Sequence, residues 1–89
     1  MKVQALPEKY KHYVLVLSNG WEHAVTGETK RNILASKSQF VELEDGNSIN
    51  KSYIVQFRLD ILATTDKFKL LPEQEKKSII KAVAKQEAI

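Results

Sequence analysis

The sequence contains no cysteine, only three glycines and two prolines, and no long run of apolar residues. The lack of cysteine excludes disulfides and thiolate-bound metals, so apolar packing must supply the stability of the fold. The longest apolar run, Tyr13 to Leu17, is far too short for a membrane span or for the apolar region of a signal peptide. Three glycines are also too few for a phosphate-binding loop, because two of them lie in predicted turns.

The composition is typical of one small globular domain. The chain has 89 residues, of which 43% are hydrophobic and 28% are charged, and this balance excludes a disordered chain. Its net charge of +3 is spread along the sequence, whereas dedicated DNA-binding proteins usually show a stronger patch. We therefore expect a cytoplasmic protein that permits a polyanionic partner without requiring one.

Residues 53–61 show the clearest periodicity and are predicted to form the central strand. Every second residue from Tyr53 to Ile61 is apolar, and Gln56, Arg58 and Asp60 lie between them. Such alternation of β-branched and aromatic residues with polar ones is typical of a strand that has one dry and one wet face. We expect the remaining elements to cover the dry face.

A hairpin is predicted over residues 12–26, because Asn19 and Gly20 separate two apolar runs. Asn-Gly is the strongest short-range hairpin signal, since both central residues of a type I′ turn adopt a positive φ. This two-residue turn would place Val14 opposite Val25.

A second strand pair is predicted around the turn at Gly46. Its first strand begins at Phe40, in the stretch Phe-Val-Glu-Leu. A three-residue loop over residues 45–47 would place Leu43 opposite Ile49, which makes a suitable apolar pair.

A short helix is predicted between the two strand pairs, over about residues 27–37. Thr26 is a suitable N-cap, and Glu28 lies in the first turn, where the helix dipole favours a negative charge. Helical spacing turns Ile33 and Leu34 inward. A helix of this length depends on packing for its stability.

The end of the chain is predicted as a connection over residues 63–71 followed by a helix over residues 72–89. Pro72 suits the first position of that helix. The helix carries a narrow apolar stripe beside a row of lysines, so we expect it to dock on the body or to bind a partner. The candidate partner-binding residues are Ile79, Ile80, Val83, Lys77 and Lys81.

Together these elements predict an α+β fold: a small, mostly antiparallel sheet in the order β-β-α-β-β-β, followed by a C-terminal helix. We expect a single domain in which residues 1–11 are a lead-in and residues 12–62 form the sheet and the short helix. The predicted core consists of apolar residues of the strands and the first helix: Val14, Leu15, Val16, Leu17, Val25, Ile33, Leu34, Phe40, Val41, Val55, Phe57, Leu59 and Ile61.

The sequence shows no arrangement of catalytic or metal-binding residues. His12 and His23 lie far apart in the predicted hairpin, and no third ligand accompanies them at a useful spacing. Nucleophile-elbow, dinucleotide-binding and Walker-type motifs are missing. We therefore expect a protein that is not an enzyme and that uses no metal and no cofactor.

Two kinds of partner remain open. The candidate nucleic-acid contacts are Lys30, Arg31, Lys51 and Arg58, although lysine and arginine are also the usual residues of a solvated surface. The C-terminal helix suits a protein partner or a second copy of the chain better than a membrane, because its apolar stripe is short and lacks tryptophan, phenylalanine and leucine. A protein partner or self-association is the first hypothesis, and DNA is the alternative.

Two resemblances lie in the middle of the chain. The order of turn-flanked strands, short helix, Phe-Val-Glu-Leu, Asp-Gly and Ile-Asn-Lys-Ser-Tyr-Ile-Val resembles small uncharacterised phage and prophage proteins of Gram-positive bacteria. Residues 49–55 also resemble the His-Arg-Ser-Tyr-Ile-Val-Asn stretch of LytTR-type DNA-binding domains, with Asn50 and Lys51 in place of the His-Arg pair. The first resemblance implies a phage or prophage protein in the host cytoplasm, whereas the expectation of a non-catalytic accessory module rests on the missing catalytic motifs and the amphipathic C-terminal helix. The second implies that Lys51, Ser52 and Arg58 are the positions nearest DNA.

Overall fold

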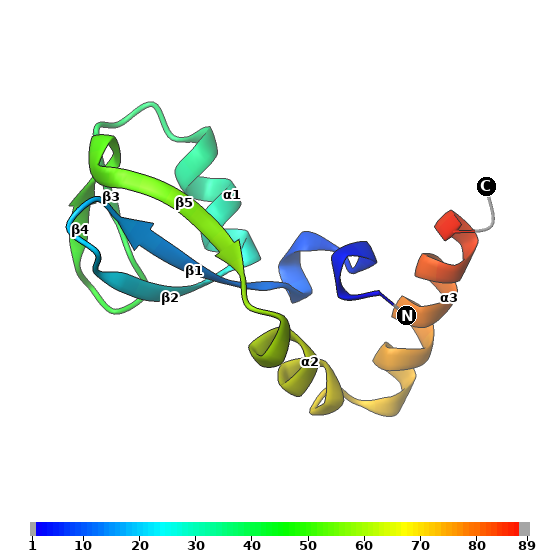
Figure 1. Ribbon diagram of the computed structural model, residues 1–89. Helices are drawn as coiled ribbons and strands as arrows, with labels where there is room; N and C mark the ends of the chain where they lie inside the picture. Colours follow the sequence, from blue (N-terminus) through cyan, green and yellow to red (C-terminus); the bar gives the residue numbers. More distant parts are fainter. Residues whose placement is uncertain (1, 88–89) are drawn as a thin grey trace.

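The computed structural model describes residues 2–87 and shows an elongated α+β molecule (Figure 1). Its extents are 39 × 25 × 19 Å, and its radius of gyration of 14.7 Å exceeds the roughly 12 Å expected for a compact chain of this length. The strands and α1 lie at one end and α3 at the other, with the N-terminal segment and α2 between them. The predicted fold class is confirmed.

The described elements follow the predicted order of strands, with one additional helix. They are the 3₁₀ turns Val3–Ala5 and Glu8–Tyr10, the strands β1 (His12–Leu17) and β2 (Glu22–Thr26), the helix α1 (Gly27–Ala35), the strands β3 (Phe40–Glu42) and β4 (Ser48–Asn50), the 3₁₀ turn Lys51–Tyr53, the strand β5 (Ile54–Leu59), and the helices α2 (Ile61–Lys69) and α3 (Glu73–Glu87).

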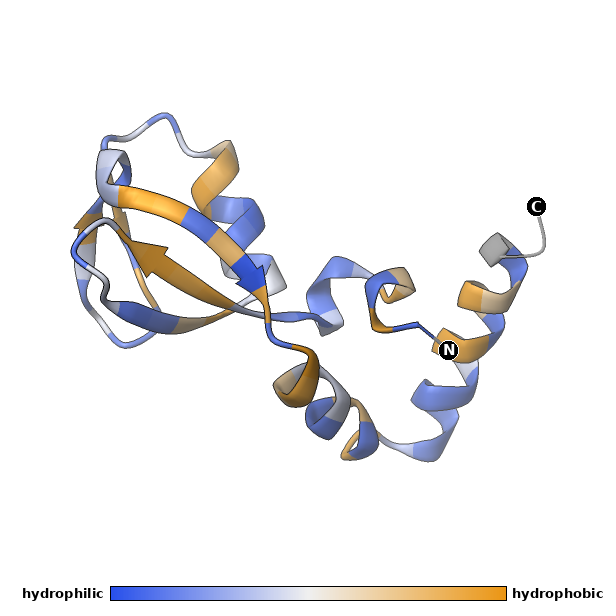
Figure 2. Ribbon diagram, in the orientation of Figure 1, coloured by the Kyte–Doolittle hydropathy of each residue, from blue (hydrophilic) through white to orange (hydrophobic). Residues whose placement is uncertain are grey.

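The central strand is β1 and not the segment 53–61, so that prediction was wrong. The main sheet has the antiparallel order β2-β1-β5, and β3 and β4 form a separate two-stranded sheet. One face of β1 carries Tyr13, Leu15 and Leu17, all of which are buried. Figure 2 shows that apolar residues are concentrated along β1 and β5.

A β-bulge explains why the alternation in β5 was misleading. Val16 pairs with Gln56 whereas Leu17 pairs with Ile54, which leaves Val55 as an extra residue. A bulge reverses the side-chain alternation of the residues beyond it. Ile54 therefore packs against the core, while Val55, predicted as a core residue, is 62% exposed.

The first hairpin has a three-residue turn, so the predicted register was wrong by one residue. The Leu17 N–H donates to the Trp21 carbonyl at 2.9 Å, and the Gly20 N–H donates to the Leu17 carbonyl at 2.9 Å. Only Gly20 adopts a positive φ, of 87°, as in a turn that ends in a G1 bulge. Val25 consequently faces Tyr13 and is buried in the core.

The second hairpin is built in the same way. The Leu43 N–H donates to the Asn47 carbonyl at 2.7 Å, and Gly46 has a φ of 89°. The loop therefore begins one residue earlier than predicted, and Ile49 faces Val41 instead of Leu43.

Helix α1 begins as predicted, with the Thr26 hydroxyl accepting from the Thr29 N–H at 3.1 Å. Ile33 is buried, but Leu34 is exposed, contrary to the prediction. A nine-residue helix packed on one side offers a single inward position per turn, and Ile33 occupies it. A Cβ atom on Gly27 would lie 1.8 Å from the Glu8 carbonyl oxygen, so this position requires glycine.

The main core lies between the three-stranded sheet, α1 and the β3–β4 hairpin. It includes two residues outside the predicted set, Tyr13 and Leu43, and its buried members are Tyr13, Leu15, Leu17, Val25, Ile33, Val41 and Leu43. The predicted core residues Leu34, Phe40, Val55 and Ile61 are exposed instead.

The predicted connection over residues 63–71 is mostly helical, because α2 occupies residues Ile61–Lys69. The Asp60 carboxylate accepts from the Ala63 N–H at 3.0 Å and so acts as the N-cap of α2. Alternation had assigned Asp60 and Ile61 to the preceding strand, which concealed the helix start.

The N-terminal segment is not a simple lead-in, because it supplies half of a second apolar cluster. Leu6 is buried there with Ile79 and Val83 of α3. The Tyr10 hydroxyl donates to Glu75 at 2.7 Å across the same contact. The C-terminal helix was predicted over residues 72–89, and its last two positions lie outside the described residues.

None of the helices within residues 2–87 combines the length and the apolar character needed to cross a membrane.

Candidate functional site

Exposed aromatic side chains gather at the end of the molecule that is farthest from α3. Three of the seven aromatic residues are more than half exposed, namely Trp21 at 65%, Phe40 at 61% and Tyr53 at 58%. All three line one hollow of about 360 Å³, which we call the aromatic hollow. Exposed apolar side chains that cluster in this way mark interaction sites more often than scattered ones do.

Three separate elements bring these aromatic residues together. Trp21 follows the β1–β2 turn, Phe40 begins β3, and Tyr53 ends the 3₁₀ turn before β5. The Tyr53 carbonyl accepts from the Ser18 N–H at 2.8 Å, which joins that 3₁₀ turn to the first hairpin. The Asn50 side chain caps the same 3₁₀ turn through the Ser52 N–H at 3.0 Å.

The two hairpin turns at the hollow share the pattern Leu-X-Asn/Asp-Gly. The Asn19 side-chain oxygen accepts from the Trp21 N–H at 2.9 Å, and an Asp45 oxygen accepts from the Asn47 N–H at 3.0 Å. Such side-chain contacts two residues ahead stiffen a turn. They fix the backbone at Trp21 and at Asn47, on the rim of the hollow.

The lining of the aromatic hollow carries hydrogen-bonding groups but no lysine, arginine, aspartate or glutamate. Besides the aromatic rings it consists of two apolar residues, one histidine and four uncharged polar residues: Leu17, Ile49, His23, Asn19, Asn47, Ser48 and Asn50. Among the described residues, Asn19 and Asn50 use their side-chain oxygens as acceptors, and their amide nitrogens donate to no protein group.

An imidazole–carboxylate pair joins the two turns beside the hollow. His23 Nδ1 lies 3.6 Å from an Asp45 carboxylate oxygen. The hydrogen bond from the Asn47 N–H lowers the pKa of Asp45, with the Asn47 side chain and His23 adding to the effect. The rings of Trp21 and His23 are tilted by 56°, with centroids 6.5 Å apart.

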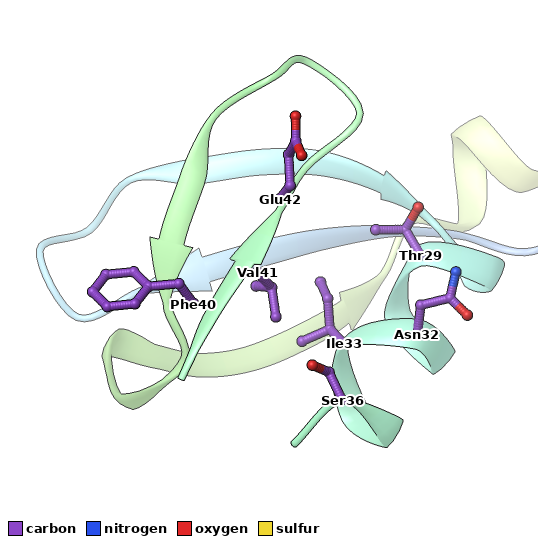
Figure 3. Close-up of a pocket in the computed structure, with 7 residues that line it drawn as sticks. All are labelled: Thr29, Asn32, Ile33, Ser36, Phe40, Val41 and Glu42. Carbon is purple, nitrogen blue, oxygen red and sulfur yellow. The ribbon is translucent and has the colours of Figure 1, made fainter. Parts of the chain in front are cut away.

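A second hollow, of about 280 Å³, lies between α1 and β3 (Figure 3). Ile33 and Val41 point toward each other in it, and the Phe40 ring points away from both. Thr29 and Asn32 of α1 and its C-cap Ser36 supply polar groups, and Glu42 is the one acidic residue among the described residues of the lining. Among the described residues, the Glu42 carboxylate accepts no hydrogen bond from the hydroxyl groups of Thr29 or Ser36.

Glu44 holds the β3–β4 turn against the start of α1. One of its carboxylate oxygens accepts from the Thr26 hydroxyl at 2.7 Å and also from the Thr29 hydroxyl. The hydrogen bond from Thr29 is the largest cause that lowers the pKa of Glu44, followed by the bonds from Thr26. The N-terminus of α1, which favours an anion, is thus occupied by a carboxylate of the chain itself.

The four candidate nucleic-acid contacts do not share one surface. Arg58 contacts Glu22 at 3.0 Å and lies on the sheet face that carries Val14, opposite the core. Lys30 and Arg31 lie on α1, which covers the other face.

Like Arg58, the two lysines of this set have partners within the chain. The Lys30 ammonium lies 4.2 Å from the centre of the Tyr13 ring. The Lys51 ammonium donates to the Ser36 carbonyl at the end of α1. Both contacts reduce the freedom of these side chains to meet a ligand.

The candidate partner-binding helix uses most of its apolar stripe within the chain. Ile79 and Val83 are buried in the second cluster, and only Ile80 of the three apolar positions is exposed. Lys77 and Lys81 are exposed.

Sequence reasoning missed the aromatic hollow because alternation placed Tyr53 on the dry face of its strand and because Phe40 was predicted to be a core residue. The available signal was the position of each aromatic residue at the edge of a turn or strand. Within residues 2–85, whose side chains the structure describes, no three histidine, aspartate or glutamate side chains are placed to hold a metal ion. Comparison of the chain with models of known protein families, with curated proteins and with solved structures finds no match.

Proposed function

We propose that this protein is a non-catalytic interaction module that binds a protein partner through the aromatic hollow. The observation that carries the proposal is the convergence of Trp21, Phe40 and Tyr53, each more than half exposed, on one hollow. Tryptophan and tyrosine are enriched among the residues that dominate protein–protein binding energies. The phage or prophage setting rests on the resemblance in the middle of the sequence.

The lining favours an uncharged, extended segment of the partner. No lysine, arginine, aspartate or glutamate of the described chain lines the hollow, so a charged ligand would find no permanent counter-charge in the lining. The Trp21 indole and the amide groups of Asn19 and Asn50 offer donors. Extended and polyproline II segments expose carbonyl groups that have no internal partner, and they dock in aromatic grooves.

Catalysis has less support than binding. His23 and Asp45 form a pair, and Ser48 lines the same hollow. Ser48 makes no hydrogen bond to His23 among the described residues, whereas an activated hydroxyl nucleophile needs contact with its base. A histidine that joins two turns explains the geometry without a reaction.

DNA binding through Lys30, Arg31, Lys51 and Arg58 remains the alternative. The separation of these residues over two faces of the sheet weakens it, because phosphate contacts need a shared basic surface.

The test uses Trp21, which is the only tryptophan of the chain and therefore a reporter for the hollow. Peptides selected from a displayed random library on the wild-type protein would be synthesised and titrated while the tryptophan emission is followed. We expect micromolar binding that shifts the emission. Tyr53→Ala should weaken binding at least about 10-fold, as for a residue at the centre of an interface.

Leu62→Ala is the matched control, because it also removes an exposed apolar side chain but lies on α2, away from the hollow. Its affinity should equal that of the wild type. Selected peptides that leave the emission unchanged and bind Tyr53→Ala equally well would contradict the proposal.

A further inference from the structure

The positive charge of the chain is concentrated outside its strand-rich part. Residues 12–60, which hold all five described strands and α1, contain five basic and six acidic side chains. The other residues contain nine basic and five acidic side chains. The net charge of +3 therefore comes from the N-terminal segment, α2 and α3, of which α3 lies at the end of the molecule opposite the strands (Figure 1).

Helix α3 presents three of these lysines as a row on its outer side, which we call the basic ridge. Lys77, Lys81 and Lys85 are exposed and lie four residues apart, so they share one face at intervals of about 6 Å. That face is opposite the one through which Ile79 and Val83 pack on the N-terminal segment. Among the described residues, none of the three lysines has an acidic partner within ion-pair distance.

The packing of α3 distinguishes between two ligands that a basic amphipathic helix can bind, a membrane surface and a polyanion. A helix that binds a membrane surface inserts its apolar face into the lipid, but here Ile79 and Val83 are already buried within the chain. On the part of α3 whose side chains are described, the surface left free offers ammonium groups together with one exposed large apolar side chain, that of Ile80. Such a surface suits a ligand that carries regularly spaced negative charges, because the lysines would bind it by electrostatic attraction.

We propose that the basic ridge binds the phosphate backbone of a nucleic acid without regard to sequence. Lysine ends spaced along one helix face neutralise phosphates and release counterions, which is the source of non-specific affinity for DNA. Phosphate contacts carry no sequence information by themselves, so binding through the ridge should not depend on the sequence of the duplex. This surface is separate from the aromatic hollow, so the two proposals stand independently.

Fluorescence anisotropy of a short labelled DNA duplex, titrated with the full chain, tests the proposal. Three phosphate contacts predict a salt slope near −2.7, or a loss of affinity of roughly 40-fold between about 50 and 200 mM salt. The triple variant Lys77→Gln, Lys81→Gln, Lys85→Gln removes this charge without changing a buried residue. It should lose most of the binding and most of the salt slope.

The matched control is the triple variant Arg31→Gln, Lys37→Gln, Arg58→Gln, which removes the same charge from the strand-rich part. It should bind the duplex as the wild type does. An equal loss in this control, or no binding by the wild type at low salt, would overturn the proposal. Poly-glutamate that competes as well as the duplex at equal charge would assign the ridge to an acidic polypeptide and overturn the nucleic-acid assignment.

Tryptophan emission keeps the two proposals distinguishable. Because Trp21 is the only tryptophan and lies at the other end of the molecule, the duplex should leave its emission unchanged. A shift in emission together with weaker duplex binding by Trp21→Ala would place the nucleic acid in the aromatic hollow and overturn the assignment to the ridge.

Discussion

Glu44 illustrates how one exposed side chain can hold two elements in place. Its carboxylate reaches from the β3–β4 turn to the hydroxyl groups of Thr26 and Thr29 at the start of α1. Because these donors stabilise the charged form, they lower the pKa of Glu44 from its ordinary value of 4.5. The position of the second hairpin, and with it one wall of the aromatic hollow, depends in part on this charge.

We predict that the stability gained from Glu44 is lost in acid. A carboxyl group whose pKa is lower in the folded state contributes its full stabilisation above the unfolded value of 4.5 and loses it as the pH falls through the folded value. Glu44→Gln should therefore be less stable than the wild type near neutral pH, and the difference should shrink below pH 4.5. Urea unfolding over a range of pH values measures both effects.

Glu42→Gln is the control, because Glu42 lies on the same hairpin and its side chain accepts no hydrogen bond among the described residues. Its stability relative to the wild type should vary less with pH than that of Glu44→Gln. Equal profiles for the two variants would show that the contacts of Glu44 do not stabilise the fold.

At the scale of secondary-structure elements, burial depends on position in the sheet more than on apolar pattern. β1 and β5 are both six residues long and rich in apolar side chains. β1 has a partner on each side, whereas β5 forms an edge and contains the bulge at Val55. β1 therefore provides the fully buried side chain of Leu15.

We predict that truncation in β1 and truncation in β5 have very different costs. Leu15 is 0% exposed, so Leu15→Ala should destabilise the fold by about 2–5 kcal/mol through lost burial and a cavity. Val55→Ala removes an exposed side chain and should change stability by less than about 0.5 kcal/mol. Thermal or urea unfolding of the two variants measures the difference, and similar losses would contradict the assignment of β1 as the central strand.

The sequence was sufficient to predict the kind and order of most elements but not their register. Alternation and helical spacing identified the five strands, α1 and α3. The register depended on where each turn places its glycine, and the short signals at Gly20 and Gly46 fit more than one loop length. A bulge cannot be recognised from the pattern of apolar residues, so the sequence did not predict that Val55 is exposed. It did not predict the aromatic hollow either.

At the scale of the whole molecule, two apolar clusters are joined at one buried polar residue. Thr64 of α2 is completely buried, and its hydroxyl oxygen accepts from the His12 N–H at the start of β1 at 2.9 Å. The same hydroxyl donates to the Asp60 carbonyl at 2.7 Å. The Asp60 N–H in turn donates to the His12 carbonyl at 2.8 Å, so the ends of β1 and β5 and the start of α2 share one set of hydrogen bonds.

We predict that Thr64→Val weakens this junction. Valine has a similar shape but leaves the His12 N–H without its partner, which should cost about 1–3 kcal/mol. Thr65→Val is the matched control, because it makes the same change in the same helix at a residue whose hydroxyl has no partner among the described residues. Urea unfolding should separate the variants, and equal stabilities would show that the hydroxyl does not hold the two clusters together.

The second apolar cluster also sets an order of events during synthesis on the ribosome. Its N-terminal half is made first and its α3 half last, as the sequence separation of 65 residues from Tyr10 to Glu75 illustrates. All members of the main core lie between Tyr13 and Leu59, so this cluster can assemble once β5 has emerged. The side chain of Leu6 then waits uncovered until α3 is complete, so an interrupted chain would display an apolar N-terminus to chaperones and proteases.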